Sequence, residues 1–171
     1  TSIDVLIHAI EYANNNIDDF HYIVLLEPTS PLTESNDIDN ALKMLIASEH
    51  AKAIVGVTEV EDSHPDFCLS IKPDGCIDSY QQTFSSTRRQ DLTTLYRFDG
   101  SVYISEIETL LREKGFYHQQ TLPYIVPKWK AFEVDDLTDF ICIEAIMNNI
   151  VEIKSQIEIS PFSPLCSELY S

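Results

Sequence analysis

Residues 22–32 constrain the fold more than any other part of the chain. An apolar run from Tyr22 to Leu26 has the length of one buried strand, and Pro28 and Pro31 stop it abruptly. A strand that is apolar on both faces is typical of the middle of a parallel sheet. Proline cannot continue a sheet interior, so the chain leaves the sheet at this strand's carboxyl end, where ligands bind in open α/β sheets. The segment therefore predicts a candidate site at the proline turn.

The rest of the chain alternates between helical and strand patterns. Apolar residues at helical spacing predict helices that begin near Ser2 and near Ser35, a short helix over 106–114 and a last helix from Asp136. Continuous or alternating apolar runs predict strands over 53–57, 100–104, 122–126 and 131–134. Helices alternating with buried strands indicate an α/β fold with a mostly parallel central sheet.

Residues 59–96 differ from this pattern because they are largely polar. Asp74 and Gly75 form a turn signal between two short apolar runs, which predicts an antiparallel hairpin. We expect this region to project from the sheet as a flap. The flap ends near Arg88 and Arg89, the most basic spot in the chain.

The sequence predicts one domain followed by a short tail. Residues 1–150 fit one domain with its own core. The last clear helix offers an apolar face that we expect to be core, made of Leu137, Phe140, Ile141, Met147 and Ile150. Residues 151–171 contain two prolines and no sustained period, so a loosely docked or disordered tail is expected.

Charge and cysteine content exclude several classes of function. The net charge is -17, with 28 acidic and 11 basic residues, which argues against partners such as nucleic acid or an anionic membrane surface. The four cysteines form no CxxC pair, which disfavours a zinc site or a redox dithiol. No signal peptide or membrane-spanning run is apparent, and a cytoplasmic protein is expected.

An acidic cluster stands where the predicted strand 131–134 meets the last helix. Asp136 and Asp139 have capping-box spacing and are interpreted as helix caps. Glu133 and Asp135 would lie on one face of the strand end. Paired carboxylates suit Mg²⁺, which takes one or two protein carboxylates together with substrate phosphates. Spacing alone leaves these two residues open between a metal site and a solvated face.

Arg88, Arg89 and Arg97 are the other charged group of interest. The arginine fork matches carboxylate and phosphate, but spacing alone favours a surface cluster of salt bridges. Phe116 and Tyr117 could be core or the wall of a substrate pocket, and in isolation they are read as core. No nucleophile has a partnered base, so covalent catalysis is unsupported.

Taken together, these segments resemble the acylneuraminate cytidylyltransferases, enzymes that make CMP-activated sialic acids and related nine-carbon sugars. The family carries LLQPTSPLR after a central strand, and this chain has Leu25-Leu26-Glu27-Pro28-Thr29-Ser30-Pro31-Leu32-Thr33. The family carries a buried strand of the VVSV kind and then HP, matched here by Ile54-Val55-Gly56-Val57 and His64-Pro65.

The resemblance continues through the second half of the chain. RRQ followed by RxNGxxYI is matched by Arg88-Arg89-Gln90 and by residues 97–104, which read RFDGSVYI. An aromatic pair, a YxxP segment and DIDTxxDF are matched by Phe116-Tyr117, by residues 124–127 and by residues 133–140. The order and approximate spacing hold from about residue 1 to residue 150, and residues 151–171 lie outside the resemblance.

The resemblance implies a Rossmann-like nucleotidyltransferase in which the anomeric hydroxyl of a sialic-acid-like nonulosonic acid attacks the α-phosphate of CTP. CMP-sugar and pyrophosphate result, and alignment and charge neutralisation drive the reaction. It implies Mg²⁺ as cofactor, CTP and an acidic nine-carbon sugar as substrates, and a homodimer formed through the flap. The implied site residues are Asp135 and Glu133 for Mg²⁺ and catalysis; Glu27, Arg89, Gln90, Arg97, Tyr103, Phe116 and Tyr117 for the sugar; and Ser2 for the nucleotide.

The chain also departs from the family pattern. The amino-terminal strand and the LARxxSKxxxxKN loop that cradles the triphosphate have no counterpart, so we expect little CTP affinity from this chain alone. Glu27 replaces a glutamine, Thr33 an arginine and Asp99 an asparagine, while Phe67 stands where lysine is common. The alternative function is therefore a truncated, non-catalytic paralogue that binds sugar or serves assembly. A weaker third reading is a related nucleotidyltransferase acting on an eight-carbon sugar acid.

Overall fold

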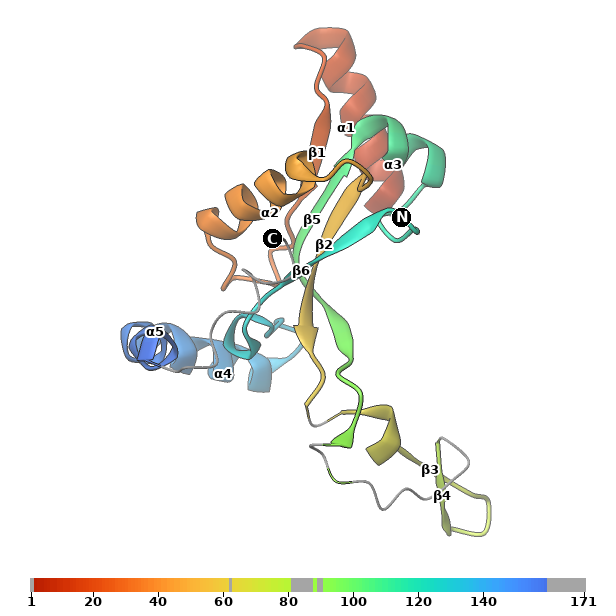
Figure 1. The fold of residues 1–171 in the computed structure, drawn as a ribbon, viewed down its shortest axis with the longest axis vertical. Coiled ribbons are helices and arrows are strands. Elements are labelled where there is room, and N and C mark those ends of the chain that lie inside the picture. Colours follow the sequence, from red (N-terminus) through yellow and green to blue (C-terminus); the bar gives the residue numbers. More distant parts are fainter. Residues whose placement is uncertain (1, 62, 81–87, 89–90, 160–171) are drawn as a thin grey trace.

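The computed structural model describes residues 2–61, 63–80, 88 and 91–159 (Figure 1). Its main sheet has the strand order β1-β5-β2-β6. The strands are β1 Tyr22–Leu25, β2 Ala53–Glu59, β5 Tyr96–Glu106 and β6 Thr121–Ile125. Three helices pack on this sheet, namely α1 Ser2–Asn16, α2 Ser35–Ala47 and α3 Ile107–Glu113. The α/β class predicted from the sequence is confirmed.

The prediction of a mostly parallel sheet is wrong for the described residues. Strand β5 is antiparallel to both of its neighbours, β1 and β2, and only β2 and β6 pair in parallel. The reason is the flap. It joins β2 to β5 as a long hairpin connection, which gives antiparallel pairing and needs no crossover helix. Strands β1, β2 and β6 still run in one direction, because helices separate them as the sequence pattern predicted.

The position of β1 also differs from the prediction. Within the described sheet β1 is an edge strand, and Val24 and Leu26 are 37% and 47% exposed. The two inner strands are β5 and β2, and six consecutive residues of β2 are buried. A continuous apolar run therefore identified a strand correctly but did not fix its place in the sheet.

Two hydrophobic clusters cover the two faces of the sheet. On one face, Ala41 and Leu45 of α2 pack against Ile54 and Ile104. On the opposite face, α1 and α3 pack against the neighbouring position Val55. Successive side chains of a strand point to opposite faces, so Ile54 and Val55 serve separate clusters. The sheet is thus a layer between helices, as Figure 1 shows.

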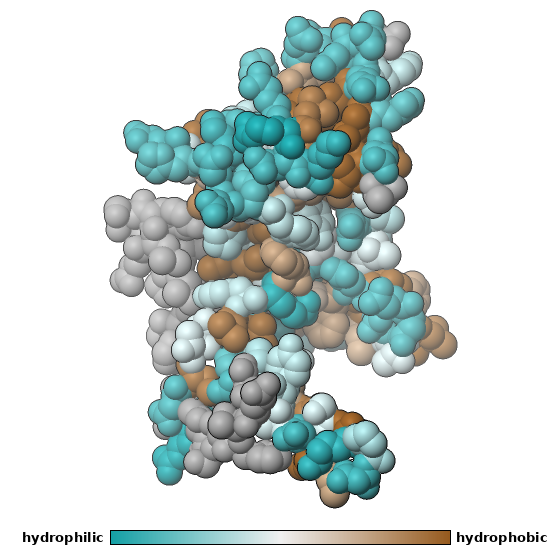
Figure 2. All heavy atoms as spheres, turned by 90° about the vertical axis from the view of Figure 1, so that its right-hand side faces the viewer, coloured by the Kyte–Doolittle hydropathy of each residue, from teal (hydrophilic) through white to brown (hydrophobic). Residues whose placement is uncertain are grey.

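The predicted hairpin in the flap is confirmed. Strands β3 Leu69–Ile71 and β4 Ile77–Ser79 pair antiparallel, preceded by the short 3-10 helix η1 Pro65–Phe67. The hairpin lies at the far end of the molecule from α1, on the arm that leaves β2 and returns as β5 (Figure 1). In the turned view of Figure 2, a few brown side chains appear at this lower end among teal ones, and larger brown areas lie at the top and in the middle of the view.

The carboxyl-terminal part holds three corrections. Residues 131–134 follow the 3-10 helix η3 Lys128–Lys130 and form no strand, so strand alternation cannot place Glu133 and Asp135. Helix α4 Leu137–Asn148 buries Ile143, whereas the predicted core residues Leu137, Phe140, Ile141 and Met147 are 53–73% exposed. The tail expected to be loosely docked or disordered over 151–171 is helical in its first part, α5 Ile150–Ile159, so disorder is wrong there, and residues 160–171 lie outside the described part.

Candidate functional site

Three segments that are distant in sequence meet beside the carboxyl end of β1. They are the proline turn after β1, the middle of β5 and the segment between η3 and α4. The Val134 amide donates to the Thr29 carbonyl at 2.8 Å, and Thr33 Oγ1 donates to the Ser101 carbonyl at 3.1 Å. Arg97 Nη2 donates to the Ala131 carbonyl at 3.1 Å. These bonds hold the turn and the acidic junction against β5.

Carboxylates gather where the three segments meet. Burial raises the pKa of Glu133, and the nearby charges of Glu27, Asp135 and Asp99 raise it further, while Arg97 opposes them. Desolvation and like charge both disfavour an ionised carboxylate. The structure therefore brings together Glu27, Glu133 and Asp135, which the sequence nominated separately, in a place where a cation would relieve their repulsion.

Gly100 makes room for Glu133. Its φ of 71° lies in the left-handed region that favours glycine. A Cβ at this position would come within 2.1 Å of Glu133 Oε1 and 3.1 Å of Ser30 Oγ. The backbone of β5 can therefore run directly beneath the Glu133 carboxyl group only because residue 100 has no side chain.

Asp99, which the sequence marked only as a departure from the family's asparagine, and Ser30, which it did not mark, are further polar groups of the site. Asp99 is 1% exposed, and its Oδ1 accepts from the Ser101 amide at 3.1 Å and from Ser101 Oγ at 2.8 Å. Asp99 Oδ2 and Ser30 Oγ are buried and have no hydrogen-bond partner among the described residues. Burial is the main cause that raises the Asp99 pKa. The Asp99-Gly100 pair inside an apolar run was the available signal.

An aromatic surface borders the carboxylates. The Tyr103 ring lies 5.4 Å from Phe116 and 6.3 Å from Tyr117, and Tyr117 lies 4.2 Å from Phe98, between ring centroids. Burial raises the Tyr103 pKa far above its usual range, with further contributions from Tyr117, Glu27 and Glu133. Phe116 is buried, whereas Tyr117 is 54% exposed and lines a cavity of about 240 Å³ with Phe98. Of the aromatic pair, Phe116 is therefore a core residue and Tyr117 lines the wall of a cavity.

The capping interpretation of the neighbouring acids is confirmed. Asp136 is the N-cap of α4, and its Oδ1 accepts from the amides of Thr138 at 2.7 Å and Asp139 at 3.1 Å. Asp139 Oδ2 in turn accepts from the amides of Asp135 and Asp136. Asp135 therefore contributes its backbone to the cap and leaves its carboxylate exposed beside Glu133.

Of the remaining predicted residues, Ser2 alone is described by the structure. Arg89 and Gln90 lie outside the described residues. Ser2 is the exposed first residue of α1, and among the described residues no hydrogen bond or ion pair links it to the carboxylates.

The fit of these residues to a metal ion is partial. No group of three or more His, Cys, Asp or Glu side chains in the described part of the chain has the geometry of a metal site. Two carboxylates, Glu133 and Asp135, are close enough to interact, and the partnerless Ser30 Oγ lies beside Glu133. This donor set suits Mg²⁺ when a substrate supplies further oxygens.

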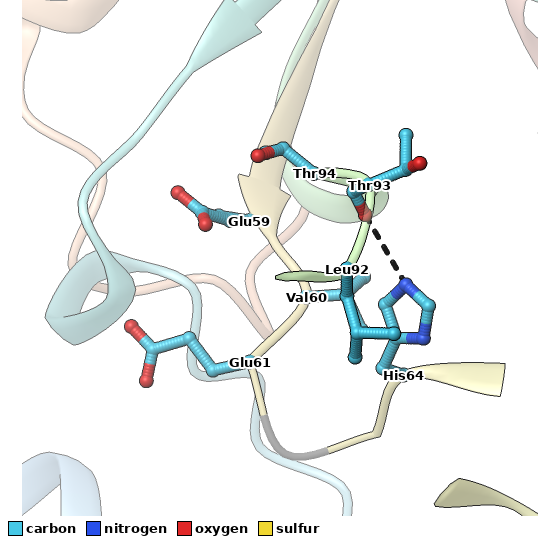
Figure 3. Close-up of a pocket in the computed structure, with 7 residues that line it drawn as sticks. All are labelled: Glu59, Val60, Glu61, His64, Leu92, Thr93 and Thr94. Carbon is cyan, nitrogen blue, oxygen red and sulfur yellow. Dashed lines mark hydrogen bonds between the residues drawn. The ribbon is translucent and has the colours of Figure 1, made fainter. Parts of the chain in front are cut away.

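A second cavity, of about 270 Å³, lies at the neck of the flap (Figure 3). His64 Nε2 lies 3.2 Å from the Thr93 carbonyl, and His64 Nδ1 accepts from the Asp66 amide at 3.2 Å. Both ring nitrogens are therefore used in holding the neck. Figure 3 shows the carboxylates of Glu59 and Glu61 pointing away from His64, so these groups do not converge on a ligand.

Comparison with known proteins agrees with the motifs. An N-acylneuraminate cytidylyltransferase of Streptococcus agalactiae serotype V is 35% identical over 127 residues, which are 74% of this chain and 30% of the relative. The Escherichia coli O18:K1:H7 enzyme of that name is 26% identical over 132 residues, 77% of this chain and 31% of the relative. A Legionella pneumophila CMP-N,N'-diacetyllegionaminic acid synthase is 27% identical over 137 residues, 75% of this chain and 54% of the relative.

These relatives are named as cytidylyltransferases or as the synthase of a CMP-activated sugar acid. Over the residues that it shares with them, this chain is similar to the acylneuraminate cytidylyltransferases, as its motifs indicated. The chain spans 30% to 54% of the length of these three relatives. No family model matches it. Among the described residues, no helix is both long and apolar enough to cross a membrane.

Proposed function

We propose that the protein represented by this chain transfers CMP from CTP to the anomeric hydroxyl of a sialic-acid-like nonulosonic acid, releasing pyrophosphate. The observation that carries this proposal is the convergence of Glu27, Glu133 and Asp135 beside the Tyr103–Tyr117 aromatic surface. The names of the relatives supply the reaction class. A Rossmann-like nucleotidyltransferase fold for the whole protein and a cytoplasmic location are part of the same proposal.

In this proposal each group has a physical task. Glu133 and Asp135 hold Mg²⁺ with oxygens of the substrates, and the ion supplies neutralisation of phosphate charge. Tyr103 and Tyr117 offer hydroxyl groups and ring faces to the sugar, with Phe116 packed behind Tyr103. Arg89, Gln90 and Arg97 bind the acidic sugar, and Ser2 contacts the nucleotide. Proximity and alignment of the two substrates provide the rest of the acceleration.

Asp135→Asn tests this assignment. In the protein that carries this chain, supplied with CTP, Mg²⁺ and candidate sugar acids, the variant should release pyrophosphate at least about 100-fold more slowly, because a Mg²⁺ ligand is worth several kcal/mol in the transition state. The matched control is Asp136→Asn, which neutralises the adjacent acid but preserves the helix cap. Equal turnover of the two variants would return Asp135 to the role of a solvated residue.

The alternative function, a non-catalytic module for sugar binding or assembly, rests on a different observation. The site has Glu27 and Asp99 where the resembled family carries neutral amides. Isothermal titration of the protein that carries this chain with CTP separates the two, because the chain alone is expected to have little CTP affinity. Measurable binding that is lost in Asp135→Asn counts against the non-catalytic module.

We also propose that the hairpin of the flap forms a homodimer contact. Its side chains Leu69, Ile71, Ile77 and Tyr80 are 53–80% exposed, and a two-stranded hairpin is marginally stable by itself. Ile71→Lys should convert a dimer to a monomer in light scattering, whereas Lys72→Met, at the adjacent position, should not. A wild-type chain that is monomeric at high concentration would contradict this contact.

A further inference from the structure

Lys130 is an unusually buried cation beside the candidate site. Its side chain is 8% exposed, and its Nζ lies 2.6 Å from Asp37 Oδ2 and 2.7 Å from Glu34 Oε2. The Tyr124 hydroxyl donates to the other Asp37 oxygen at 3.1 Å. Lysine is almost never fully buried unless it is paired. Here both carboxylate partners come from the start of α2, on the far side of the proline turn.

The Lys130 ion pairs connect the two segments that carry the site's carboxylates. Asp37 and Glu34 form the reciprocal capping box of α2, directly after the turn that begins at Glu27. Lys130 lies in η3, directly before the segment that ends in Glu133 and Asp135. The Lys130–Asp37 pair therefore joins two segments that lie 93 residues apart in the sequence. We call this connection the bracket.

The bracket leaves few ways for the acidic segment to move. Ala131, the neighbour of Lys130, is buried in the α2 core cluster and accepts a hydrogen bond from Arg97. Three residues further on, the Val134 amide bonds to Thr29 in the proline turn. Glu133 lies between these two fixed points and over the side-chain-free Gly100. Its carboxyl position is thus set by attachments on both sides.

We propose that Lys130 is a positioning residue, which fixes the Glu133–Asp135 segment against the α2 N-terminus so that the two carboxylates stand ready for a divalent cation. This inference rests on the proposed function for its cation, but the placement of the segment stands on the contacts alone. Outer-shell partners restrict a metal ligand's orientation by bonding to it, and Lys130 acts at one remove, through the backbone that joins it to Glu133.

The test uses the whole 171-residue chain and MnCl₂ as the probe. Free Mn²⁺ is followed by electron paramagnetic resonance, and exchange of the Val134 amide proton by NMR. Lys130→Met should weaken Mn²⁺ binding about 10- to 100-fold, as loss of an outer-shell partner does, and should speed Val134 exchange. Lys154→Met is the matched control, because Lys154 also pairs with Glu34 but extends from α5 and is 43% exposed. It should change neither measurement.

A third variant separates positioning from stability. Lys130→Met alone leaves Asp37 and Glu34 without their buried cation, so it destabilises the fold. Adding Asp37→Asn and Glu34→Gln removes the two carboxylate charges that faced Lys130 and should restore resistance to denaturant. Mn²⁺ affinity and Val134 protection should stay low in this triple variant. If both recover together with stability, Lys130 is merely structural and the inference is overturned.

The double variant Glu133→Gln, Asp135→Asn distinguishes failure of the inference from failure of the proposed function. If it binds Mn²⁺ as tightly as the wild type, these residues hold no cation and the proposed function loses its metal site. Val134 exchange then decides the positioning role by itself. Faster exchange in Lys130→Met than in Lys154→Met supports the role, and equal exchange overturns it.

Discussion

The inner strand β2 and the flap hairpin both contain apolar β-branched residues, but these residues are buried in β2 and exposed in the hairpin. Ile54 in β2 is 0% exposed, whereas Ile71 in β3 is 80% exposed. Strand β2 has a hydrogen-bonded neighbour on each side and a helical layer on each face. Each strand of the hairpin pairs only with the other and, among the described residues, no helix packs on them. Apolar sequence thus creates a core only where a second layer covers it.

This difference separates the part of the molecule that stabilises the fold, the sheet with its helices, from the part that exposes apolar side chains, the flap hairpin. Exposed apolar side chains on a two-stranded hairpin contribute little to the stability of the chain that carries them. They are also more than scattered surface residues, because Leu69, Ile71, Ile77 and Tyr80 belong to one projecting hairpin (Figure 1). The body of the molecule, meaning the main sheet and the helices packed on it, is therefore stable without the hairpin. By our proposal, the hairpin is a contact surface.

The largest expected contrast comes from one substitution made in both places. Ile54→Ala should lower the free energy of unfolding by about 2–5 kcal/mol, because it opens a cavity under α2. Ile71→Ala should cost less than about 0.5 kcal/mol, as surface changes do. Both values come from guanidinium unfolding at a protein concentration low enough to suppress association. A comparable loss in both variants would mean that the hairpin is covered in the monomer.

Two glycines with positive φ sharpen the contrast. At Gly75 in the hairpin, φ is 84° and an added Cβ meets nothing within 4 Å. Gly75→Ala should therefore cost only the backbone strain, about 1 kcal/mol. Gly100→Ala adds the collision with Glu133 and should cost about 2–3 kcal/mol, combining backbone strain with overpacking. Thermal unfolding of both variants measures the difference, and equal melting temperatures would show that Glu133 moves aside freely.

A smaller contrast concerns two aspartates that cap backbone amides. Asp136 accepts two amide bonds at the start of α4, and Asp74 accepts one, from Cys76, in the hairpin turn. Asp136→Ala should cost about 1 kcal/mol, as loss of an N-cap does. Asp74→Ala should cost a few tenths, about the size of other exposed surface changes. Urea unfolding detects the first. The ranking fails if Asp74→Ala proves the more costly change.

The smallest expected effect is a dependence of the free energy of unfolding on pH, which comes from Glu34 at the start of α2. Hydrogen bonds from Lys130 and then Lys154 hold the pKa of Glu34 below its ordinary value of 4.5. A depressed pKa in the folded state means that this stabilisation is complete above pH 4.5 and is lost as the pH falls further. The free energy of unfolding of Glu34→Gln should therefore fall less steeply with acid than that of the wild type. Parallel acid curves would remove Glu34 from this role.

Local sequence rules located most of the elements. The helices beginning near Ser2 and Ser35, the Asp136 capping box and the Asp74-Gly75 hairpin all follow from contacts between near neighbours. The insertion of β5 between β1 and β2 does not, because it depends on pairing between distant segments. For the same reason the exposure of α4 was missed, since periodicity marks an apolar face without saying what covers it.

The candidate site shows the same division. Family motifs nominated Glu27, Tyr103, Glu133 and Asp135, and the structure brings them together. The strand expected to align Glu133 with Asp135 is absent from residues 131–134, and their proximity comes instead from tertiary bonds such as Val134 to Thr29. The Lys130–Asp37 pair could not be read from the sequence, because nothing local marks a lysine as buried.

The place of β5 between β1 and β2 also sets an order for folding. Tyr22 pairs with Glu106 and Leu25 with Tyr103, so β1 gains this partner only after the whole flap has been synthesised. Until then the ribosome has released β2 with neither of its neighbours, β5 and β6, in place. Such non-local pairing slows folding. A nascent chain that stops within the flap would expose strands with unpaired edges, which are prone to aggregate.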